Sequence, residues 1–231
     1  GFQTERRERS GQPIIEVQSL THRYGTIPAL QEVDLSILPG EFVAIVGENG
    51  SGKTTLIKHF NGLLRPTSGK VLIHGKETSR ATVSELARNV GLVFQNPDHM
   101  FFRDTVREEI AFGPENLDIP EASAIVEDVL SKVRLSGVQH LYPRWLSRGE
   151  RQRLAIGCIL AMQPPVIALD EPTTGLDGRE TREILELLKV LQADGHTIVM
   201  VTHNRHIAEK CADRVIQMEK GRIVSDTDRG R

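Results

Sequence analysis

The sequence contains few cysteines, few aromatic residues and no long hydrophobic run. Its two cysteines, Cys158 and Cys211, stand far apart, so no disulfide framework is expected. No apolar run reaches the length of about 18 residues that a membrane-spanning helix needs. Charge of one sign is not in large excess either, since the formal net charge is −2. A basic surface for nucleic acid is therefore not indicated.

What the sequence does contain is enough apolar material for one domain. Hydrophobic residues make up 39% of the 231 residues and charged residues 26%, which predicts a buried core under a charged surface. We expect one domain over residues 14–225, followed by a tail at 226–231. Residues 1–13 are polar and begin with Gly1, so we interpret them either as a linker or as a tag remnant. In the first case the chain is one piece of a longer polypeptide.

Residues 47–54 fit the pattern G-x-x-x-x-G-K-[ST] of a phosphate-binding loop. Glycines let the backbone approach an anion closely, and the loop N–H groups then cradle phosphate oxygens. Lys53 is expected to bind the β- and γ-phosphates, and Thr54 to ligate Mg²⁺. The alternative is a glycine-rich turn that binds nothing, but the apolar strand before the loop and the helix after it favour a nucleotide. The predicted nucleotide contacts here are Gly47, Glu48, Asn49, Gly50, Ser51, Gly52, Lys53, Thr54 and Thr55.

Strand and helix patterns alternate along most of the chain, which predicts an α/β fold with a largely parallel sheet. An antiparallel β part is expected near the N-terminus, and a helical subdomain at about 96–146 is inserted into the α/β body. Capping boxes at Thr105–Glu108 and Ser147–Glu150 predict two helix starts. Apolar patterns predict strands at 14–20, 33–37, 42–46, 70–73, 90–94, 166–169 and 197–201, and a closing strand at 215–218. A turn is expected at 21–25. Helices are predicted at 54–60, 82–88, 120–134, 147–162 and 206–212, and a further helix ends before Gly195.

Two acidic residues follow the apolar strand at 166–169. The carboxyl ends of parallel strands line the ligand crevice of an α/β sheet, so Asp170 and Glu171 are expected beside the phosphate loop. Asp170 is predicted to hold Mg²⁺ through its water shell, and Glu171 to polarise an attacking water. His203 follows the next strand and is expected to hydrogen-bond Glu171 and the γ-phosphate. The alternative for His203 is a surface histidine without a role in the site.

Together these motifs resemble those of the ATP-binding-cassette (ABC) ATPases, over about residues 14–225. Residues 146–150, Leu-Ser-Arg-Gly-Glu, resemble the signature motif of that family. The resemblance implies that Tyr24 stacks on adenine and that Gln95 joins the body to the helical subdomain, with a part in catalysis and Mg²⁺ binding. It also implies that Asp177 lies in a segment that crosses a dimer interface. The alternatives are an aromatic that shields the core for Tyr24 and a polar strand cap for Gln95.

In that family two subunits bind ATP between them, head to tail. The resemblance implies that Ser147 and Gly149 contact the ATP of a second subunit, through free N–H groups at the start of a helix. The signature commonly reads Leu-Ser-Gly-Gly-Gln, and Arg148 and Glu150 depart from it. Arg148 either points away from the phosphates or adds a cation there. Glu150 keeps a capping acceptor and adds a negative charge.

The segment 94–117 resembles that of the energy-coupling-factor (ECF) ATPases, which power the uptake of vitamins or transition metals. The resemblance implies that this segment helps to form a groove for a helix of a transmembrane scaffold protein. The run Met100-Phe101-Phe102 suits such a contact. The alternative is that these three side chains pack against the subdomain's own helices. ECF ATPases often carry a further C-terminal segment, so this chain either lacks it or is one cassette of a fused tandem pair.

The leading hypothesis is an ATPase of a membrane importer that binds ATP and Mg²⁺ and lies peripherally on the cytoplasmic face of the membrane. Its expected partners are a second cassette, identical or different, and a transmembrane scaffold protein, with no nucleic acid. One alternative is a soluble ABC ATPase that acts on nucleic acid or the ribosome, although no long coiled coil separates the phosphate loop from the signature. Another is a nucleotide-gated module that does not hydrolyse ATP. The sequence identifies no transported substrate.

Overall fold

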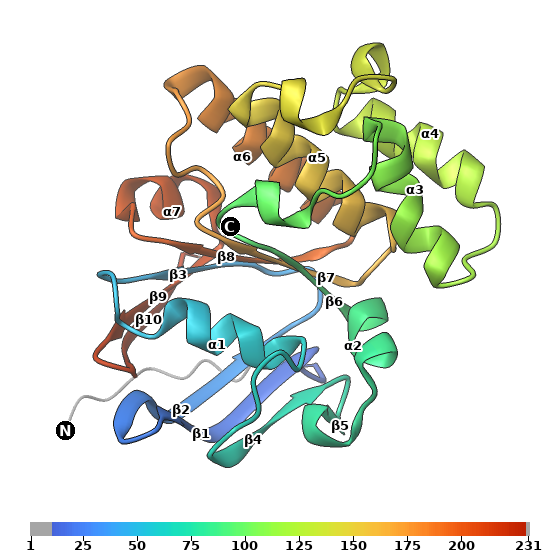
Figure 1. The fold of residues 1–231 in the computed structure, drawn as a ribbon. Coiled ribbons are helices and arrows are strands. Elements are labelled where there is room, and N and C mark those ends of the chain that lie inside the picture. The colour runs from blue at the N-terminus through green and yellow to red at the C-terminus, as the bar shows by residue number, and fades with distance from the viewer. Residues whose placement is uncertain (1–10, 230–231) are drawn as a thin grey trace.

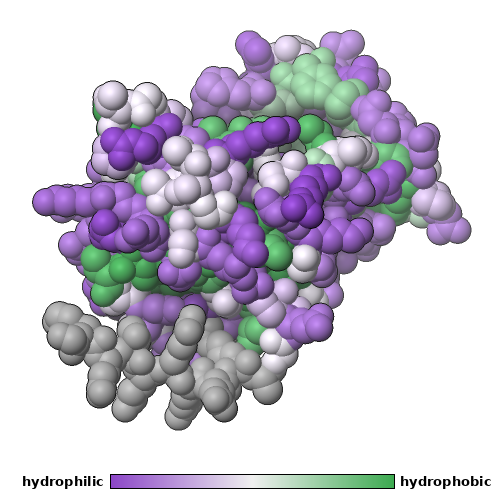
Figure 2. Space-filling view, turned by 90° about the horizontal axis from the view of Figure 1, so that it is seen from below, coloured by the Kyte–Doolittle hydropathy of each residue, from purple (hydrophilic) through white to green (hydrophobic). Residues whose placement is uncertain are grey.

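A computed structural model describes residues 11–229 and shows two β-sheets with helices packed around them (Figure 1). Residues 1–10 of the expected linker and residues 230–231 of the expected tail lie outside the described residues. Within residues 11–229 no helix has both the length and the apolar character that crossing a membrane requires. Hydrophilic residues cover most of the face shown in Figure 2, with smaller hydrophobic patches between them.

The larger sheet has six strands in the order β10-β9-β3-β8-β7-β6. All neighbouring pairs are parallel except β9 and β10, which are antiparallel. The strands are β3 (Phe42–Val46), β6 (Val90–Val93), β7 (Val166–Asp170), β8 (Thr197–Thr202), β9 (Arg214–Glu219) and β10 (Arg222–Asp228).

Side chains of the parallel strands point alternately into two hydrophobic cores. Phe42, Ala44 and Val46 of β3 belong to the core under the helical layer, whereas Val43 and Ile45 belong to the core on the other face. Both faces of the sheet are therefore covered, which explains why its strands read as continuous apolar runs and not as alternating ones.

The smaller sheet is antiparallel, with the order β2-β1-β4-β5, as expected for the N-terminal part of the chain. Its strands are β1 (Ile15–Tyr24), β2 (Ile27–Ile37), β4 (Ser68–Ile73) and β5 (Lys76–Glu77). Helix α1 (Lys53–Phe60) lies between the two sheets, and its Leu56, Ile57 and Phe60 are fully buried in the second core. The helix that follows the phosphate loop is thus held by both sheets (Figure 1).

Three α-helices lie between β6 and β7 in the chain, and the predicted subdomain at 96–146 covers the first two of them. Helices α3, α4 and α5 pack against one another there (Figure 1). Thr105 and Ser147 form the predicted capping boxes at the starts of α3 and α5, each with the glutamate three residues on. The other helices are α2, α6 and α7. The bounds are α2 (Val83–Asn89), α3 (Val106–Asn116), α4 (Ala122–Lys132), α5 (Arg148–Ala161), α6 (Gly178–Ala193) and α7 (Arg205–Cys211).

Three predicted boundaries are wrong in the first two thirds of the chain. The strand predicted at 33–37 is β2, which begins at Ile27. Residues 21–24 are not a turn but the end of β1, since they pair with β2; the turn follows at Gly25, whose φ is 60°. Helix α4 does not begin at Pro120. Glu121 has a left-handed φ of 59°, which a right-handed helix cannot include, so the helix begins at Ala122.

The predicted closing strand, β9, is not the last one. Lys220 and Gly221 both have positive φ, 46° and 78°, and this two-residue turn sends the chain back as β10. Arg214 of β9, 5% exposed, forms a two-pronged ion pair with Asp226 of β10, with N–O distances of 2.7 and 2.6 Å. Residues 226–228, expected as a tail, therefore belong to the sheet.

Candidate functional site

The phosphate loop connects the end of β3 to the start of α1, as predicted. Its glycines are required by space and by conformation. A β-carbon on Gly47 would lie 2.3 Å from the carbonyl oxygen of Met218, and one on Gly52 would lie 2.7 Å from that of Ala29. Gly50 and Gly52 also have φ angles of 82° and 102°, which side chains rarely adopt. The loop backbone can therefore take this path only with glycine at these positions.

Lys53 folds back over this loop. Its Nζ donates to the carbonyl oxygens of Gly47 at 2.8 Å and of Glu48 at 2.9 Å, and the side chain is largely buried. Burial lowers the pKa of Lys53, while the negative charges of Glu171 and Asp170 act in the opposite direction. The ammonium group is thus placed beside the loop, within the field of two carboxylates.

Thr54 and Asp170 form the pair that suits Mg²⁺. The Thr54 hydroxyl lies 2.9 Å from each carboxylate oxygen of Asp170, which is 6% exposed at the end of β7. Burial raises the pKa of Asp170, and the hydrogen bond from Thr54 counteracts this shift. Hydroxyl and carboxylate oxygens are ligands that Mg²⁺ prefers, and it commonly takes its remaining ligands from water and phosphates. Within residues 11–229, no group of three or more His, Cys, Asp or Glu side chains is placed to hold a metal ion.

Glu171 and His203 form the second pair. His203 Nδ1 lies 2.9 Å from Glu171 Oε2, and the Thr174 hydroxyl lies 3.1 Å from the same oxygen. The backbone of Glu171 is left-handed, with a φ of 48°, and its N–H donates to the Val201 carbonyl. Because backbone and side chain are both anchored, the Glu171 carboxylate has a fixed direction. The predicted hydrogen bond between Glu171 and His203 is present.

One cavity of about 410 Å³ brings most of the predicted residues together. It joins the phosphate loop, the adenine-stacking candidate Tyr24 and the Glu171–His203 pair. Sequence reasoning did not assign Ile27, Pro28, Ala29 or Thr174 to this site; the first three belong to a strand segment without a motif. The lining residues are Tyr24, Ile27, Pro28, Ala29, Asn49, Gly50, Gly52, Lys53, Thr54, Thr55, Gln95, Glu171, Thr174 and His203.

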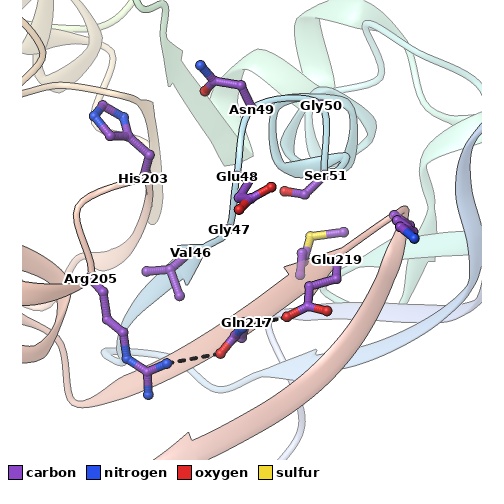
Figure 3. A pocket seen from close by; sticks show the side chains of 12 residues that line it. Val46, Gly47, Glu48, Asn49, Gly50, Ser51, His203, Arg205, Gln217 and Glu219 are labelled. Atoms are coloured by element: carbon purple, nitrogen blue, oxygen red, sulfur yellow. Dashed lines mark hydrogen bonds between the residues drawn. The ribbon is translucent and has the colours of Figure 1, made fainter.

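A second hollow of about 700 Å³ adjoins the phosphate loop (Figure 3). Its floor comes from β9, where Arg205 of α7 donates to Gln217 at 3.0 Å and Gln217 donates to Glu219 at 2.8 Å. Asn49 and His203 line this hollow as well as the first cavity. No sequence motif pointed to Gln217 or Glu219, because the strand that carries them reads only as a core strand.

Ser147, Gly149 and Asp177 line neither cavity. The start of α5 was predicted to present free N–H groups, and one of these groups is not free, since the Gly149 N–H donates to Glu180 Oε1 at 3.1 Å. The same Glu180 forms a capping box with Asp177 at the start of α6. The carboxylate of Glu180 thereby accepts a hydrogen bond from a backbone N–H that was expected to donate to a phosphate.

The side chain of Arg148, which departs from the common signature, packs against another segment of the same chain. A β-carbon added to Gly175 would be 2.5 Å from Arg148 Cζ, so the guanidinium group packs on the backbone of the segment before α6. Glu150 fulfils the capping role expected of it, because its carboxylate accepts the Ser147 N–H at 2.8 Å. Both departures from the common signature therefore have a place in the local structure.

Comparison with known proteins decides the family. The family model described as ABC transporter matches residues 30–174. The chain belongs to the ABC transporter family. This confirms the predicted cassette fold with its phosphate loop and the expected ATPase domain, while the roles of single site residues stay predictions.

Relatives of this cassette include proteins named as transporter ATPases. One, from Methanosarcina acetivorans and named as an ABC transporter ATP-binding protein, is 58% identical over 218 residues, which cover 94% of this chain and 41% of the relative. The chain thus spans less than half the length of this relative. The energy-coupling factor transporter ATP-binding protein EcfA1 of Methanospirillum hungatei is 43% identical over 217 residues, covering 92% of this chain and 78% of EcfA1.

Solved structures agree with this assignment. CbiO1 of Clostridium perfringens, described as part of the ABC transporter complex CbiONQ, superimposes with a TM-score of 0.87 at 35% identity, over 95% of this chain and 90% of CbiO1. The cassette MJ0796, solved as a dimer in a post-hydrolysis state with ADP and Pi, superimposes with a TM-score of 0.83 at 30% identity, over 94% of this chain and 99% of MJ0796.

Proposed function

We propose that the chain is an ATP-hydrolysing cassette of an importer of the ECF type. ATP hydrolysis is supported by one observation above all. The phosphate loop, Thr54 with its partner Asp170, and the Glu171–His203 pair meet at a single cavity. Phosphoryl transfer requires positioning and charge stabilisation more than covalent chemistry from the protein, and this cavity offers both.

The triphosphate would lie along the loop backbone and the start of α1. Loop N–H groups bind its oxygens, and the helix adds the positive end of its dipole. Lys53 exchanges its carbonyl partners at Gly47 and Glu48 for phosphate oxygens, which carry more negative charge. Tyr24, half exposed at the cavity, offers a ring face to the base.

Water attack is assigned to the two carboxylates and His203. Thr54, Asp170 and Gln95 would hold Mg²⁺, which neutralises charge on the phosphate oxygens when it is bound. Glu171 orients the attacking water and accepts its proton. His203 fixes the Glu171 carboxylate from a distance of 2.9 Å, and its partly exposed ring can also donate to the γ-phosphate.

A second cassette, identical or different, is part of the proposal. Ser147 and Gly149 lie outside the nucleotide cavity of their own chain, which supports a role at the nucleotide of a second chain, once the Gly149 N–H exchanges Glu180 for a phosphate oxygen. Ser147 is exposed at the start of α5, as a contact to a second copy requires. The similar cassette MJ0796 has been solved as a dimer.

The ECF assignment is supported by the relatives EcfA1 and CbiO1 and by the segment before α3. Of Met100, Phe101 and Phe102, which were expected to contact the scaffold, two pack against the core and one is exposed. Phe101 is 8% exposed and Met100 packs on the main core, as the alternative had it, but Phe102 is 62% exposed. Phe102 is the apolar side chain that we assign to contact with a transmembrane scaffold at the cytoplasmic face of the membrane.

The first experiment is the Glu171→Gln variant. The amide keeps the size of the side chain but cannot accept the proton of the water, so we expect ATP turnover to fall by about 100-fold or more. Light scattering of this variant should show a dimer with Mg-ATP and a monomer without it, because bound ATP is no longer consumed.

Glu186→Gln provides the matched control, since Glu186 is an exposed acid on α6. It should leave turnover and the oligomeric state unchanged. Wild-type turnover in the Glu171→Gln protein would remove Glu171 from the mechanism. A monomer with Mg-ATP would mean that this cassette does not pair with itself.

A further inference from the structure

Two buried histidines connect the candidate base-stacking ring of Tyr24 to α1, the helix that follows the phosphate loop. His59 on α1 is 0% exposed and His22 on β1 is 7% exposed. His22 and Tyr24 are two positions apart in a strand, so their side chains share one face. The His22 ring meets the Tyr24 ring edge to face with centroids 4.7 Å apart, and it meets the His59 ring in the same way at 4.8 Å.

Hydrogen bonds fix the direction of both imidazole rings. His59 Nδ1 lies 2.7 Å from the Thr55 carbonyl oxygen, which can only accept, so Nδ1 carries a proton and donates it. Burial is the main reason that the pKa of His59 is lowered, and the ring is therefore neutral near pH 7. Its other ring nitrogen, Nε2, faces His22. His22 Nδ1 lies 3.2 Å from this Nε2 and 3.0 Å from the Arg65 carbonyl oxygen, so His22 Nδ1 is a donor as well.

These contacts form a continuous chain from the first turn of α1 to the base side of the cavity. Thr55 and Tyr24 both line the nucleotide cavity, and the two histidines connect them behind its wall. Tyr24 itself is 50% exposed and is the last residue of its strand. Within residues 11–229, the His22 ring is the ring that packs edge to face against Tyr24, and such a contact favours one orientation of the ring.

We propose that His22 and His59 are positioning residues for the base of the nucleotide, acting through Tyr24. The pair holds the Tyr24 ring at a fixed place relative to the phosphate-loop helix, so that one ligand meets the ring and the loop together. It therefore contributes to the affinity for the base and not to the affinity for the phosphates. This inference rests on the proposed binding of ATP. A pair that only stabilises the core would affect every ligand of the loop alike.

The test compares two ligands, ATP and inorganic tripolyphosphate, which shares the phosphates and lacks the base. The variant His59→Asn keeps a donor near the Thr55 carbonyl and removes the ring, with the nitrogen that faces His22. Calorimetric titration of the full chain with each ligand, in the presence of Mg²⁺, measures both affinities. The variant should bind ATP roughly fivefold more weakly than the wild type, which is the scale of one aromatic pair. Tripolyphosphate affinity should change by less than about twofold. In a Tyr24→Ala background, His59→Asn should have no further effect on ATP, because the ring it positions is gone.

The control is His74→Asn, in the exposed turn between β4 and β5, where asparagine suits the positive φ of 49°. It should alter neither affinity. Should His59→Asn not fold, His22→Phe keeps the ring edge near Tyr24 and removes the donor, and the same selective loss is expected. Equal losses for both ligands, or losses that add to that of Tyr24→Ala, would overturn the inference. A wild-type chain that binds neither ligand would instead refute the proposed function.

Discussion

At the scale of single residues, His59 makes stability depend on pH. Burial lowers its pKa in the folded state below the ordinary value of 6.5, so the charged form is favoured in the unfolded chain. Above pH 6.5 the His59 imidazole is neutral in both the folded and the unfolded chain, so its protonation costs no stability. As the pH falls below 6.5, the unfolded state takes up the proton first and stability is lost, until the pH reaches the folded pKa.

We therefore expect wild-type stability to fall relative to that of His59→Asn as the pH decreases from 7 to 5, by up to about 1.4 kcal/mol per pH unit. Urea unfolding of both proteins at each pH measures this difference, in which the titration of other groups cancels. The titratable group facing His59 is His22, and the Thr55 and Arg65 carbonyls complete its surroundings. A difference that stays constant between pH 7 and pH 5 would contradict the prediction.

Residues next to strand ends could be predicted, and residues joined only by packing could not. Asp170, Glu171 and His203 follow strands of a parallel sheet, and parallel strands end on one edge, so their proximity follows from the pattern. His22 and His59 belong to different elements, and no periodicity shows that a histidine in α1 faces one in β1. The predicted turn at residues 21–25 also hid the fact that His22 and Tyr24 share a strand face.

At the scale of elements, a buried carboxylate shapes the segment between β6 and α3. Glu109 of α3 is 3% exposed and accepts the N–H groups of Phe102 and Arg103. Burial raises the pKa of Glu109, and these two bonds oppose the shift. The Phe102 ring is thereby displayed beside Phe112, with ring centroids 4.5 Å apart.

For this segment we predict that Phe102→Asp weakens association with the transmembrane scaffold of the transporter. A charge in place of an exposed aromatic removes apolar contact area and adds a desolvation cost. Co-purification after co-expression with the scaffold should decrease by about tenfold or more, and basal ATPase activity should stay unchanged. Val83→Asp on α2, 81% exposed, is the matched control. Equal effects of the two variants would show that the segment is not the contact.

Element starts with capping boxes were predictable, whereas elements that depend on unusual backbone were not. Thr105 and Ser147 predict the starts of α3 and α5. In each capping box, side-chain oxygens of the cap residue and of the glutamate three residues on accept backbone N–H groups locally. Strand β10 follows a Lys220–Gly221 turn, and lysine is not a residue that favours positive φ, so the hairpin has no clear sequence signal. Likewise Glu180 joins the starts of α5 and α6 across 31 positions, a contact that only the tertiary fold creates.

At the scale of the whole molecule, the residues that we propose as parts of a nucleotide site fall into two groups at separate places in the fold. The phosphate loop, Glu171 and His203 share one cavity, and the signature residues Ser147 and Gly149 lie outside it. The signature residues therefore cannot contribute to the nucleotide cavity of their own chain in this conformation. In the proposed head-to-tail pairing of two cassettes, one chain's signature would reach the other chain's loop, and catalysis would then depend on assembly.

The only tryptophan of the sequence reports on this assembly. Trp145 is 76% exposed and lies two positions before Ser147, with its ring near that of Tyr142. If α5 starts at a cassette interface, Trp145 lies at or beside it, and pairing removes water from the indole. In the Glu171→Gln protein, Mg-ATP should therefore shift the emission to shorter wavelength and reduce quenching by acrylamide. The same variant with Lys53→Ala added should show neither change, because the loop has lost its cation. A dimer seen by light scattering without any change at Trp145 would place the interface away from the signature and refute the head-to-tail arrangement.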